Sequence, residues 1–366
     1  MSARRRAAGA LLMAVLLLAG CSSGSGDGPE PGPSGRTGSG DGGEGGASRE
    51  AGGSGPGGKA AGMRGITLPS WNTDDYSGPQ AAPYLRQIAA TGARWVTFTP
   101  TWYQDDVTDS AMHTTGETAG DDSLRHIIGL AHATGLKVMV KPHVDLTKGG
   151  DRAGIKPRDP DAWFAAYERF ITHYATLAAE TGTEQLAVGT ELAGTSRDGT
   201  RWSKVVRAVR AHYRGPLTYA ANYDEYAAVP FWDDLDVIGI DAYWPLADRP
   251  TTDAGRLRDA WKPVTGELAA FSARHHRKIL FTEAGYVSQR GTTTAPYSWT
   301  VSKSGGEDEQ AAAYEALLTA LDGKPWWAGV CWWMWDDWPD SGETPRRLAY
   351  TPHGKPAEKV LRRRWG

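Results

Sequence analysis

Eight short runs of β-branched and apolar residues recur along the last 304 residues, and longer segments with helical periodicity separate most of them. Strands that alternate with helices predict an α/β protein with a parallel sheet. Eight strands in one chain favour a closed (β/α)8 barrel, the TIM barrel. A doubly wound open sheet is the alternative, although no Gly-rich nucleotide fingerprint follows any strand. The predicted strands are Gly65–Leu68, Arg94–Thr99, Leu136–His143, Gln185–Glu191, Leu217–Asn222, Val237–Tyr243, Lys278–Glu283 and Gly329–Trp335.

Three of the intervening helices have clear start signals. Acidic residues open the segments Leu124–Ala133 and Gln310–Leu321, and Asp159 followed by Pro160 precedes Ala162–Glu180. Acidic side chains complement the positive end of the helix dipole, and proline fits the first helical turn. The sequence therefore predicts helices over these three segments.

Residues 1–20 resemble a bacterial lipoprotein signal peptide. Arg4 to Arg6 form a positive region, and the apolar run that follows, about 13 residues long, is too short to span a bilayer. The run ends in Leu18-Ala19-Gly20-Cys21, which resembles the lipobox whose cysteine is lipidated after cleavage. An ordinary secretory signal with an incidental cysteine is the alternative. We expect Cys21 to carry a lipid anchor that holds the protein outside the cytoplasm, on the cell membrane.

Residues 21–62 have the composition of a disordered linker. Ser22 to Gly62 contain 17 glycines and no aromatic residue, and all 16 tryptophans of the chain follow them. Such a segment cannot bury enough apolar surface to offset its ordering entropy. As a flexible coil it would span about 35 Å. We therefore expect one folded domain, residues 63–366, tethered to the membrane.

Composition excludes several classes of function. The 40 basic and 43 acidic residues give a net charge of −3, so no broad basic field is present to bind nucleic acid. The two cysteines, Cys21 and Cys331, provide no disulfide framework, and Cys331 is predicted to be a buried, inert thiol. No zinc-ligand run, P-loop or Gly-x-Ser-x-Gly elbow occurs. We expect no metal, no cofactor and a monomer.

Two glutamates stand at the ends of predicted strands. Glu191 ends the fourth strand and Glu283 ends the seventh. Strand alternation predicts that Glu191 shares the axis-facing side with Ala187 and Gly189. The active site of this fold lies at the C-terminal ends of the barrel strands, so both carboxyls are expected in that site. A pair of carboxylates there indicates acid–base catalysis rather than two unrelated acids at strand ends.

Four sequence strings together resemble glycoside hydrolase family 113, whose characterised members are endo-β-1,4-mannanases in the retaining clan of (β/α)8 barrels. The resemblance extends from Met63 to the C-terminus. It implies that Glu191 is the general acid and base and that Glu283 is the nucleophile, with their carboxyls about 5–5.5 Å apart. The clan usually has Asn before its acid/base, where this chain has Thr190. The strings are VGTEL around Glu191, GIDAYWP from Gly239, FTEAGY around Glu283 and WWMWDDW from Trp332.

Other residues near the strand ends are candidates for the same site. Tyr243 lies two residues beyond Asp241, from where its hydroxyl could hold the nucleophile. Lys141, His143, Asn222 and Asp241 are candidate hydrogen-bond partners of a sugar. Pyranose rings stack on flat aromatic surfaces. Trp333 and Trp335, predicted on one face of the last strand, are therefore candidate sugar platforms, with Trp102 and Trp71 as further candidates.

The resulting expectation is a lipid-anchored, extracytoplasmic, retaining glycoside hydrolase that cleaves a β-1,4-linked polysaccharide, with β-mannan preferred. A glucanase or xylanase on the same scaffold is one alternative. A non-catalytic glycan-binding lipoprotein is another, although both glutamates argue against it. An enzyme that remodels the cell's own envelope would also suit the anchor.

Overall fold

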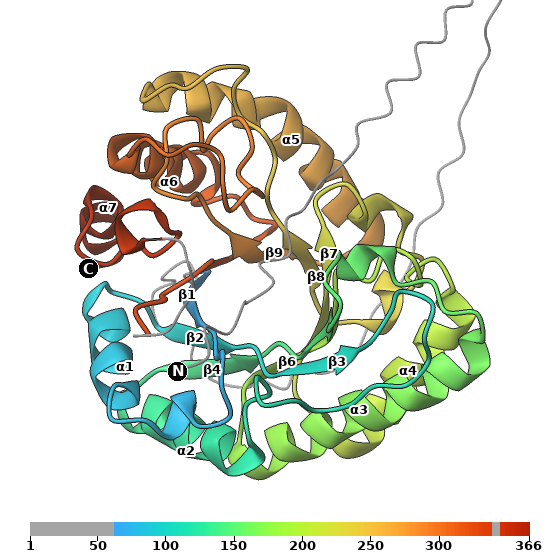
Figure 1. The fold of residues 1–366 in the computed structure, drawn as a ribbon. Helices are drawn as coiled ribbons and strands as arrows, with labels where there is room; N and C mark the ends of the chain where they lie inside the picture. Colours follow the sequence, from blue (N-terminus) through green and yellow to red (C-terminus); the bar gives the residue numbers. More distant parts are fainter. Residues whose placement is uncertain (1–61, 339–344) are drawn as a thin grey trace, which may run out of the picture. The chain divides into compact units, whose positions relative to one another are not determined.

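The computed structural model describes residues 62–338 and 345–366. Within them, eight parallel strands form a closed barrel in the order β1-β10-β9-β8-β7-β6-β4-β2, which confirms the predicted (β/α)8 fold (Figure 1). The predicted signal peptide, Cys21 and the linker lie outside the described residues. The barrel strands are β1 (Met63–Leu68), β2 (Trp95–Phe98), β4 (Lys137–Val140), β6 (Gln185–Thr190), β7 (Leu217–Asn222), β8 (Ile238–Asp241), β9 (Ile279–Ala284) and β10 (Trp327–Trp332).

A second, two-stranded parallel sheet continues two of the barrel strands. It pairs β3 (Thr101–Gln104) with β5 (His143–Leu146), and Thr101 lies opposite His143. Pro100 and Pro142 separate these strands from β2 and β4. Proline has no N–H to donate to a ladder, which interrupts the predicted continuous strand at Pro142. The short sheet therefore carries His143 beyond the C-terminal end of the barrel.

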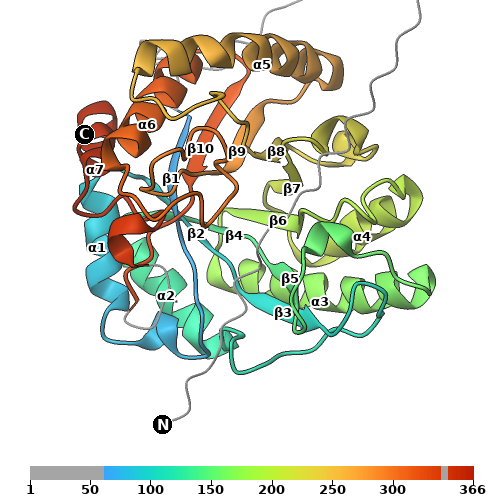
Figure 2. The same ribbon diagram turned by 45° about the horizontal axis from the view of Figure 1, so that its top comes forward.

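Helices surround the barrel, as Figures 1 and 2 show. The three helices predicted from start signals are confirmed; Asp159 caps α3 by accepting the N–H of Ala162. Between β7 and β8 the connection consists of 3-10 turns instead of an α-helix. Among the described residues no helix is long and apolar enough to cross a bilayer. The α-helices are α1 (Ala81–Ala90), α2 (Asp121–Ala133), α3 (Pro160–Thr181), α4 (Gly199–His212), α5 (Ala254–His275), α6 (Glu307–Leu321) and α7 (Pro356–Trp365).

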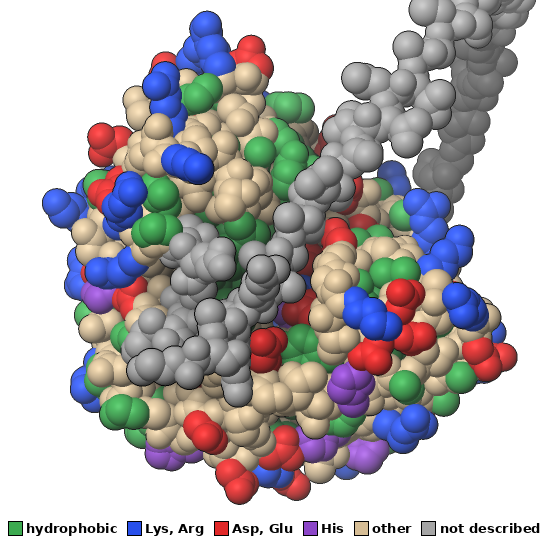
Figure 3. All heavy atoms as spheres, in the orientation of Figure 1, with side chains coloured by type: hydrophobic (Ala, Val, Ile, Leu, Met, Phe, Trp, Pro, Cys, Tyr) green, Lys and Arg blue, Asp and Glu red, His purple; other side chains and the backbone are tan. Residues whose placement is uncertain are grey.

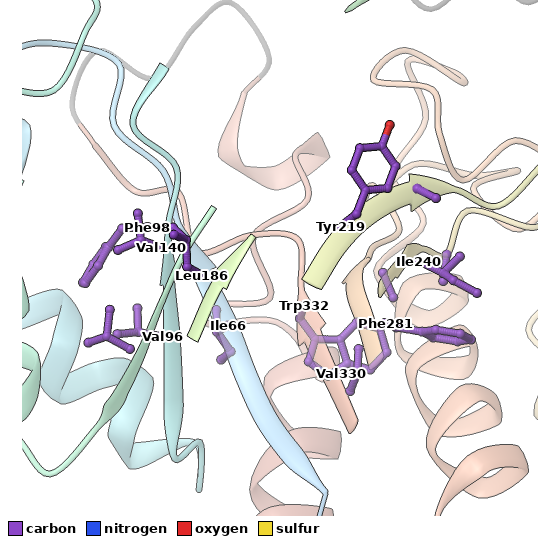
Figure 4. Packing of buried hydrophobic residues seen from close by; sticks show 14 of the residues in the cluster. Ile66, Val96, Phe98, Val140, Leu186, Tyr219, Ile240, Phe281, Val330 and Trp332 are labelled. Carbon is purple, nitrogen blue, oxygen red and sulfur yellow. The ribbon is translucent and has the colours of Figure 1, made fainter. Parts of the chain in front are cut away.

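The main hydrophobic core lies between the strands and the helices (Figure 4). Phe281 of β9 packs on Trp261 of α5, with ring centroids 5.8 Å apart, and Trp332 of β10 stacks on Tyr314 of α6 at 3.7 Å. Large aromatic side chains bury much apolar area per residue, so these contacts fix the helices on the barrel.

A smaller cluster fills the barrel interior. It joins Met63, Met139, Leu280 and Cys331 from four different strands. Thr97 Oγ1 donates to Cys331 Sγ at 3.2 Å, and burial raises the pKa of this thiol to about 12. A thiol that stays protonated is a poor nucleophile, as predicted for Cys331.

Candidate active site

The predicted site residues converge at the C-terminal end of the barrel. Lys141 follows β4, Glu191 follows β6, Asp241 ends β8 and Glu283 lies in β9. In the space-filling view, some acidic side chains are visible near the centre of this face, and most of the visible Lys and Arg side chains lie toward its edge (Figure 3). Because parallel strands all end on one side, the fold alone brings these four side chains together.

Both carboxylate oxygens of Glu283 are engaged by neighbours. Tyr243 Oη donates to Oε2 at 2.6 Å, and Lys141 Nζ donates to Oε1. Only 4% of Glu283 is exposed. These two donors, one on each oxygen, fix the orientation of the carboxyl group. The structure thus places Tyr243 where the sequence predicted it.

Lys141 and Asp241 lie entirely below the surface of the site. Lys141 Nζ also donates to Asp241 Oδ2 at 3.2 Å, and Thr282 Oγ1 donates to Asp241 Oδ1 at 2.7 Å. Neither ion-paired side chain is exposed, so both contact protein groups rather than the space that a sugar would occupy. Their prediction as sugar partners is therefore corrected. Asn222 ends β7 beside Asp241 and is nearly buried, with its backbone N–H donated to Glu225.

Opposing charges shift the pKa values of this buried pair. Burial raises the pKa of Asp241 to about 7; Glu283 adds to the rise, and Lys141 opposes it. Burial alone would lower the pKa of Lys141, but Asp241 and Glu283 raise it above its ordinary value. The charged form of Lys141 is therefore favoured beside Glu283.

The backbone geometry that orients the Glu191 side chain differs from the strand alternation that the sequence predicted. The pairing of β6 with β7 shifts register between Ala187 and Thr190, and a Cβ on Gly189 would lie 2.8 Å from the Trp202 ring of α4. Gly189 therefore faces the helices, not the axis, and the predicted shared face is wrong. Glu191 itself has a φ of 54°, in the left-handed region. This bulge and the positive φ direct the Glu191 side chain into the site at the C-terminal end of the barrel.

The Glu191 carboxyl is held in a largely buried position. Its side chain is 18% exposed. Burial raises its pKa well above the ordinary range; Asp241 adds to the rise, Arg152 opposes it, and Glu283 adds further. A carboxyl that stays protonated near neutral pH can serve as a general acid.

Arg152 is a site residue that the sequence analysis missed. Its Nη1 donates to Glu191 Oε2 at 3.2 Å, while Nε and Nη2 donate to Asp145 Oδ1 at 2.8 and 2.6 Å. It lies in a loop with three further basic residues, Lys148, Lys156 and Arg158. Nothing in the sequence separates Arg152 from them, because its role depends on the pairing with Asp145.

His143 presents a free ring nitrogen at the site. The ring stacks on Trp333, with centroids 6.3 Å apart and planes at 20°. Its Nε2 is buried and has no hydrogen-bond partner among the described residues. Burial lowers the pKa of His143 well below its ordinary value, with Arg152 and Lys141 contributing to the shift. The imidazole is thus neutral and retains one atom without a hydrogen-bond partner; its contact with a sugar stays a prediction.

The four tryptophans predicted as sugar platforms lie in different surroundings. Trp333 clusters with Tyr243, which contacts Glu283, and the partly exposed Trp71 packs against the same cluster. Trp335 is fully buried and stacks on His353, because β10 ends at Trp332 and alternation does not continue. Trp102 packs on Phe170 of α3. Trp335 is therefore a core residue, and its prediction as a sugar platform is wrong. Trp102 is only partly buried, and its prediction as a platform stays a prediction.

Comparison with known proteins identifies the family. The model for Glycoside Hydrolase Family 113 matches residues 69–355, most of the barrel. The chain belongs to glycoside hydrolase family 113. It is therefore a glycoside hydrolase, and its substrate is an oligosaccharide or polysaccharide. No curated protein sequence matches the chain.

Solved structures of family 113 enzymes are similar over nearly their whole length. A β-1,4-mannanase structure is 27% identical, with a TM-score of 0.74, and the match covers 83% of this chain and 99% of that one. The β-mannanase of Alicyclobacillus acidocaldarius in complex with ManMIm is 28% identical, with a TM-score of 0.75 and coverage of 84% and 98%. A Ruminococcus gnavus β-glucuronidase, 12% identical with a TM-score of 0.57, covers 84% and 50% and shares the fold alone.

Two further features complete this family 113 site. Thr190, which stands where the wider clan usually has Asn, is buried and its Oγ1 donates to Pro142 O at 3.4 Å. Its hydroxyl is thus directed at the backbone. In the described part of the chain, no group of three or more His, Cys, Asp or Glu side chains is arranged to hold a metal ion.

Proposed function

We propose that this family 113 enzyme is a retaining endo-β-1,4-mannanase that acts by double displacement, with Glu283 as nucleophile and Glu191 as general acid and base. The contrast between the two carboxyls carries the proposal. Glu283 is held in place by donors from Lys141 and Tyr243, whereas burial and Asp241 favour the protonated form of Glu191. An anionic nucleophile facing a protonated acid is the pairing that a retaining glycosidase requires before its first step.

In the first step, a Glu283 oxygen attacks the anomeric carbon and the glycosidic C–O bond breaks. Glu191 gives its proton to the departing oxygen, and the product is a glycosyl ester on Glu283. Tyr243 and Lys141 hold the nucleophile in the attacking geometry.

In the second step, Glu191 acts as a base. Formation of the ester removes the negative charge of Glu283, one of the groups that raise the pKa of Glu191. The ionised Glu191 then takes a proton from water, the water oxygen attacks the anomeric carbon, and the ester bond breaks. Both glutamates return to their starting protonation states, and the anomeric configuration is retained.

The substrate assignment rests on the two family 113 mannanases that resemble the chain over nearly their full length. Trp333 and the free nitrogen of His143 supply a stacking surface and a polar contact for a pyranose ring. A β-glucanase or xylanase would use the same two glutamates. Only the contacts to the sugar hydroxyls would differ.

The decisive experiment measures reducing-end release by the purified domain, residues 62–366, from β-mannan, cellulose, xylan and laminarin. Mannan-selective release that is lost in Glu283→Gln supports the proposal. A 2-deoxy-2-fluoro mannosyl fluoride should label Glu283, as found by peptide mapping. Azide should restore turnover of an activated substrate in Glu191→Ala and give a β-glycosyl azide. Labelling of another residue, or an inverted product, would refute the mechanism.

We also propose that Cys21 is lipidated and anchors the enzyme outside the cytoplasm, which rests on the signal-like sequence before it. Expression of the full chain in a bacterium should place it in the detergent phase after Triton X-114 partitioning. Cys21→Ser should move it to the aqueous phase or leave it uncleaved. Equal partitioning of both chains would contradict the anchor.

A further inference from the structure

We propose that the end of the barrel opposite the active site docks on a membrane surface that contains anionic phospholipid. This basal face consists of the residues at which the barrel strands begin and the ends of the helices that precede them. Membrane docking is independent of the proposed reaction, and the proposed lipid anchor only places a membrane near the domain. Three features carry the proposal: the charge of the basal face, a cavity in it, and the point at which the linker joins the barrel.

Cations gather on the basal face, although the chain as a whole is acidic. The chain has 43 acidic and 40 basic residues. Six of the eight barrel strands nevertheless begin within three residues of an exposed or partly exposed lysine or arginine. Because like charges repel, such a concentration of cations is unfavourable unless an anion offsets it. The six cations are Arg64, Arg94, Lys137, Arg214, Lys278 and Lys324.

The acidic residues on the same face are engaged by other groups. Glu184 and Asp236, which precede the remaining two strands, each accept a backbone N–H from a neighbouring strand, at 2.8 and 2.7 Å. Their side-chain pairs involve cations other than the six, so they leave the charge of those six largely unopposed. These pairs are Glu184 with His132 and Asp236 with Arg210; Asp322, at the end of α6, pairs with Arg364.

A cavity of about 390 Å³ lies in the basal face. Lys137 Nζ is 5.6 Å from the centroid of the Trp95 ring, and Arg94 Nη1 donates to the carbonyl of Ala93. Three of the six lining residues are cationic and none is acidic, so the cavity suits an anionic phosphate head group. The lining residues are Gly62, Arg64, Arg94, Trp95, Gly135 and Lys137.

Two partly exposed tryptophans accompany the cations. Trp95 begins β2, and Trp326 directly precedes β10. Tryptophan is enriched at the level of lipid head groups, where its ring contacts both apolar and polar surroundings. Lysine and arginine side chains near a membrane are attracted to anionic lipid. Because a soluble anion would need only the cations, the combination of cations with tryptophan favours a membrane surface as the partner.

The point at which the linker joins the barrel also favours a membrane. Gly62, the first described residue, lines the same cavity. The linker, which we propose to carry a lipid at Cys21, is therefore connected to the domain at the basal face. A weak contact is sufficient for docking when a tether keeps the domain near the surface. Docking through the basal face leaves the opposite end of the barrel, which holds both glutamates, open to a polysaccharide.

The first test is vesicle cosedimentation of residues 62–366, whose described elements form one closed barrel with its own core. Phosphatidylglycerol vesicles should sediment the domain and phosphatidylcholine vesicles should not. Raising the salt concentration from about 0.1 to 1 M should release it, because salt screens exposed charges. Arg94→Glu combined with Lys137→Glu should lower the vesicle affinity more than about tenfold. Hydrolysis of soluble mannan-oligosaccharides should stay unchanged in this variant, which shows that it folds.

A matched variant controls for net charge. Lys148→Glu combined with Lys303→Glu makes the same charge change at two exposed lysines in loops that follow β5 and β9, at the other end of the barrel. Its vesicle affinity should equal that of the parent domain. If the parent does not hydrolyse mannan, the proposed function fails, but vesicle binding still tests the basal face.

Amine acetylation of the lipidated full chain, followed by mass spectrometry, tests the orientation without any substitution. In phosphatidylglycerol vesicles, Lys137 and Lys278 should react several-fold more slowly than in phosphatidylcholine vesicles. Lys148 and Lys303 should react equally in both. The anchor is the same in the two kinds of vesicle, so a difference between them reports docking alone.

Three results would overturn the proposal: equal binding to both lipids, an equal loss of affinity in the control variant, or protection of Lys148 and Lys303 in place of Lys137 and Lys278. Binding to soluble polyphosphate but not to vesicles would also overturn it, and would assign the basal face to an anionic polymer.

Discussion

Arg152 donates from Nη1 to Oε2 of Glu191 at 3.2 Å, so a guanidinium contacts the carboxyl that we propose as the general acid. Asp145 holds this guanidinium from the other side. Arg152 limits the rise in the pKa of Glu191 that burial and Asp241 cause. An acid with too high a pKa would be a poor base in the second step.

Arg152→Gln should therefore move the basic limb of the kcat/KM profile to higher pH, because the substitution removes a cation that lowers the pKa of Glu191. We expect kcat to fall by about 10²-fold, within the usual contribution of general acid–base catalysis. Lys148→Gln removes an exposed positive charge from the same loop and is the control. Equal profiles for the two variants would show that the contact with Glu191 has no role.

The positive φ of Glu191 predicts a conflict between stability and function. A non-glycine residue in the left-handed region costs about 1 kcal/mol, which glycine avoids. Glu191→Gly should be more stable than Glu191→Ala by about this amount, and both should lack acid catalysis. Urea unfolding of the two inactive variants measures the difference. Equal free energies of unfolding would mean that the backbone at this position carries no strain.

His143 makes stability depend on pH. Its pKa is lowered in the folded protein, so the unfolded chain binds the extra proton first as pH falls. The contribution of His143 is complete above the unfolded pKa near 6.5 and is lost as pH decreases toward the folded value. In His143→Gln the free energy of unfolding should decline less between pH 7 and 5, by up to about 1.4 kcal/mol per pH unit. Parallel curves for both proteins would contradict a buried neutral imidazole.

The two neighbouring tryptophans should respond differently to truncation. Trp335 is fully buried and stacks on His353, so Trp335→Ala should cost about 3–5 kcal/mol of stability. Trp333→Ala removes the ring beside His143 and should raise KM for mannan-oligosaccharides or lower kcat. Thermal melts and steady-state kinetics on both variants make the comparison. An active Trp333→Ala enzyme with unchanged KM would remove Trp333 from the site.

Local sequence patterns were sufficient for the elements and for the general position of the site. Short apolar strands, helix start signals and strand-end glutamates are properties of neighbouring residues, and the barrel brings strand ends together whatever the side chains are. Glu191, Glu283 and Tyr243 were found in this way. Alternation failed at Gly189 and Trp335, because a register shift in β6 and the end of β10 interrupt the period of two.

The sequence by itself determined the eight-stranded barrel, the family resemblance and the two carboxyls at the C-terminal end of the barrel. Each of these depends on residues that are close together in the chain. Only the tertiary structure decided which charged side chains lie in contact. Lys141 and Asp241 are 100 residues apart, and Arg152 and Glu191 are 39 apart. Electrostatic pairing depends on distance and burial in space, which no local pattern encodes. For that reason the side chains that contact the two glutamates became visible only in the folded barrel.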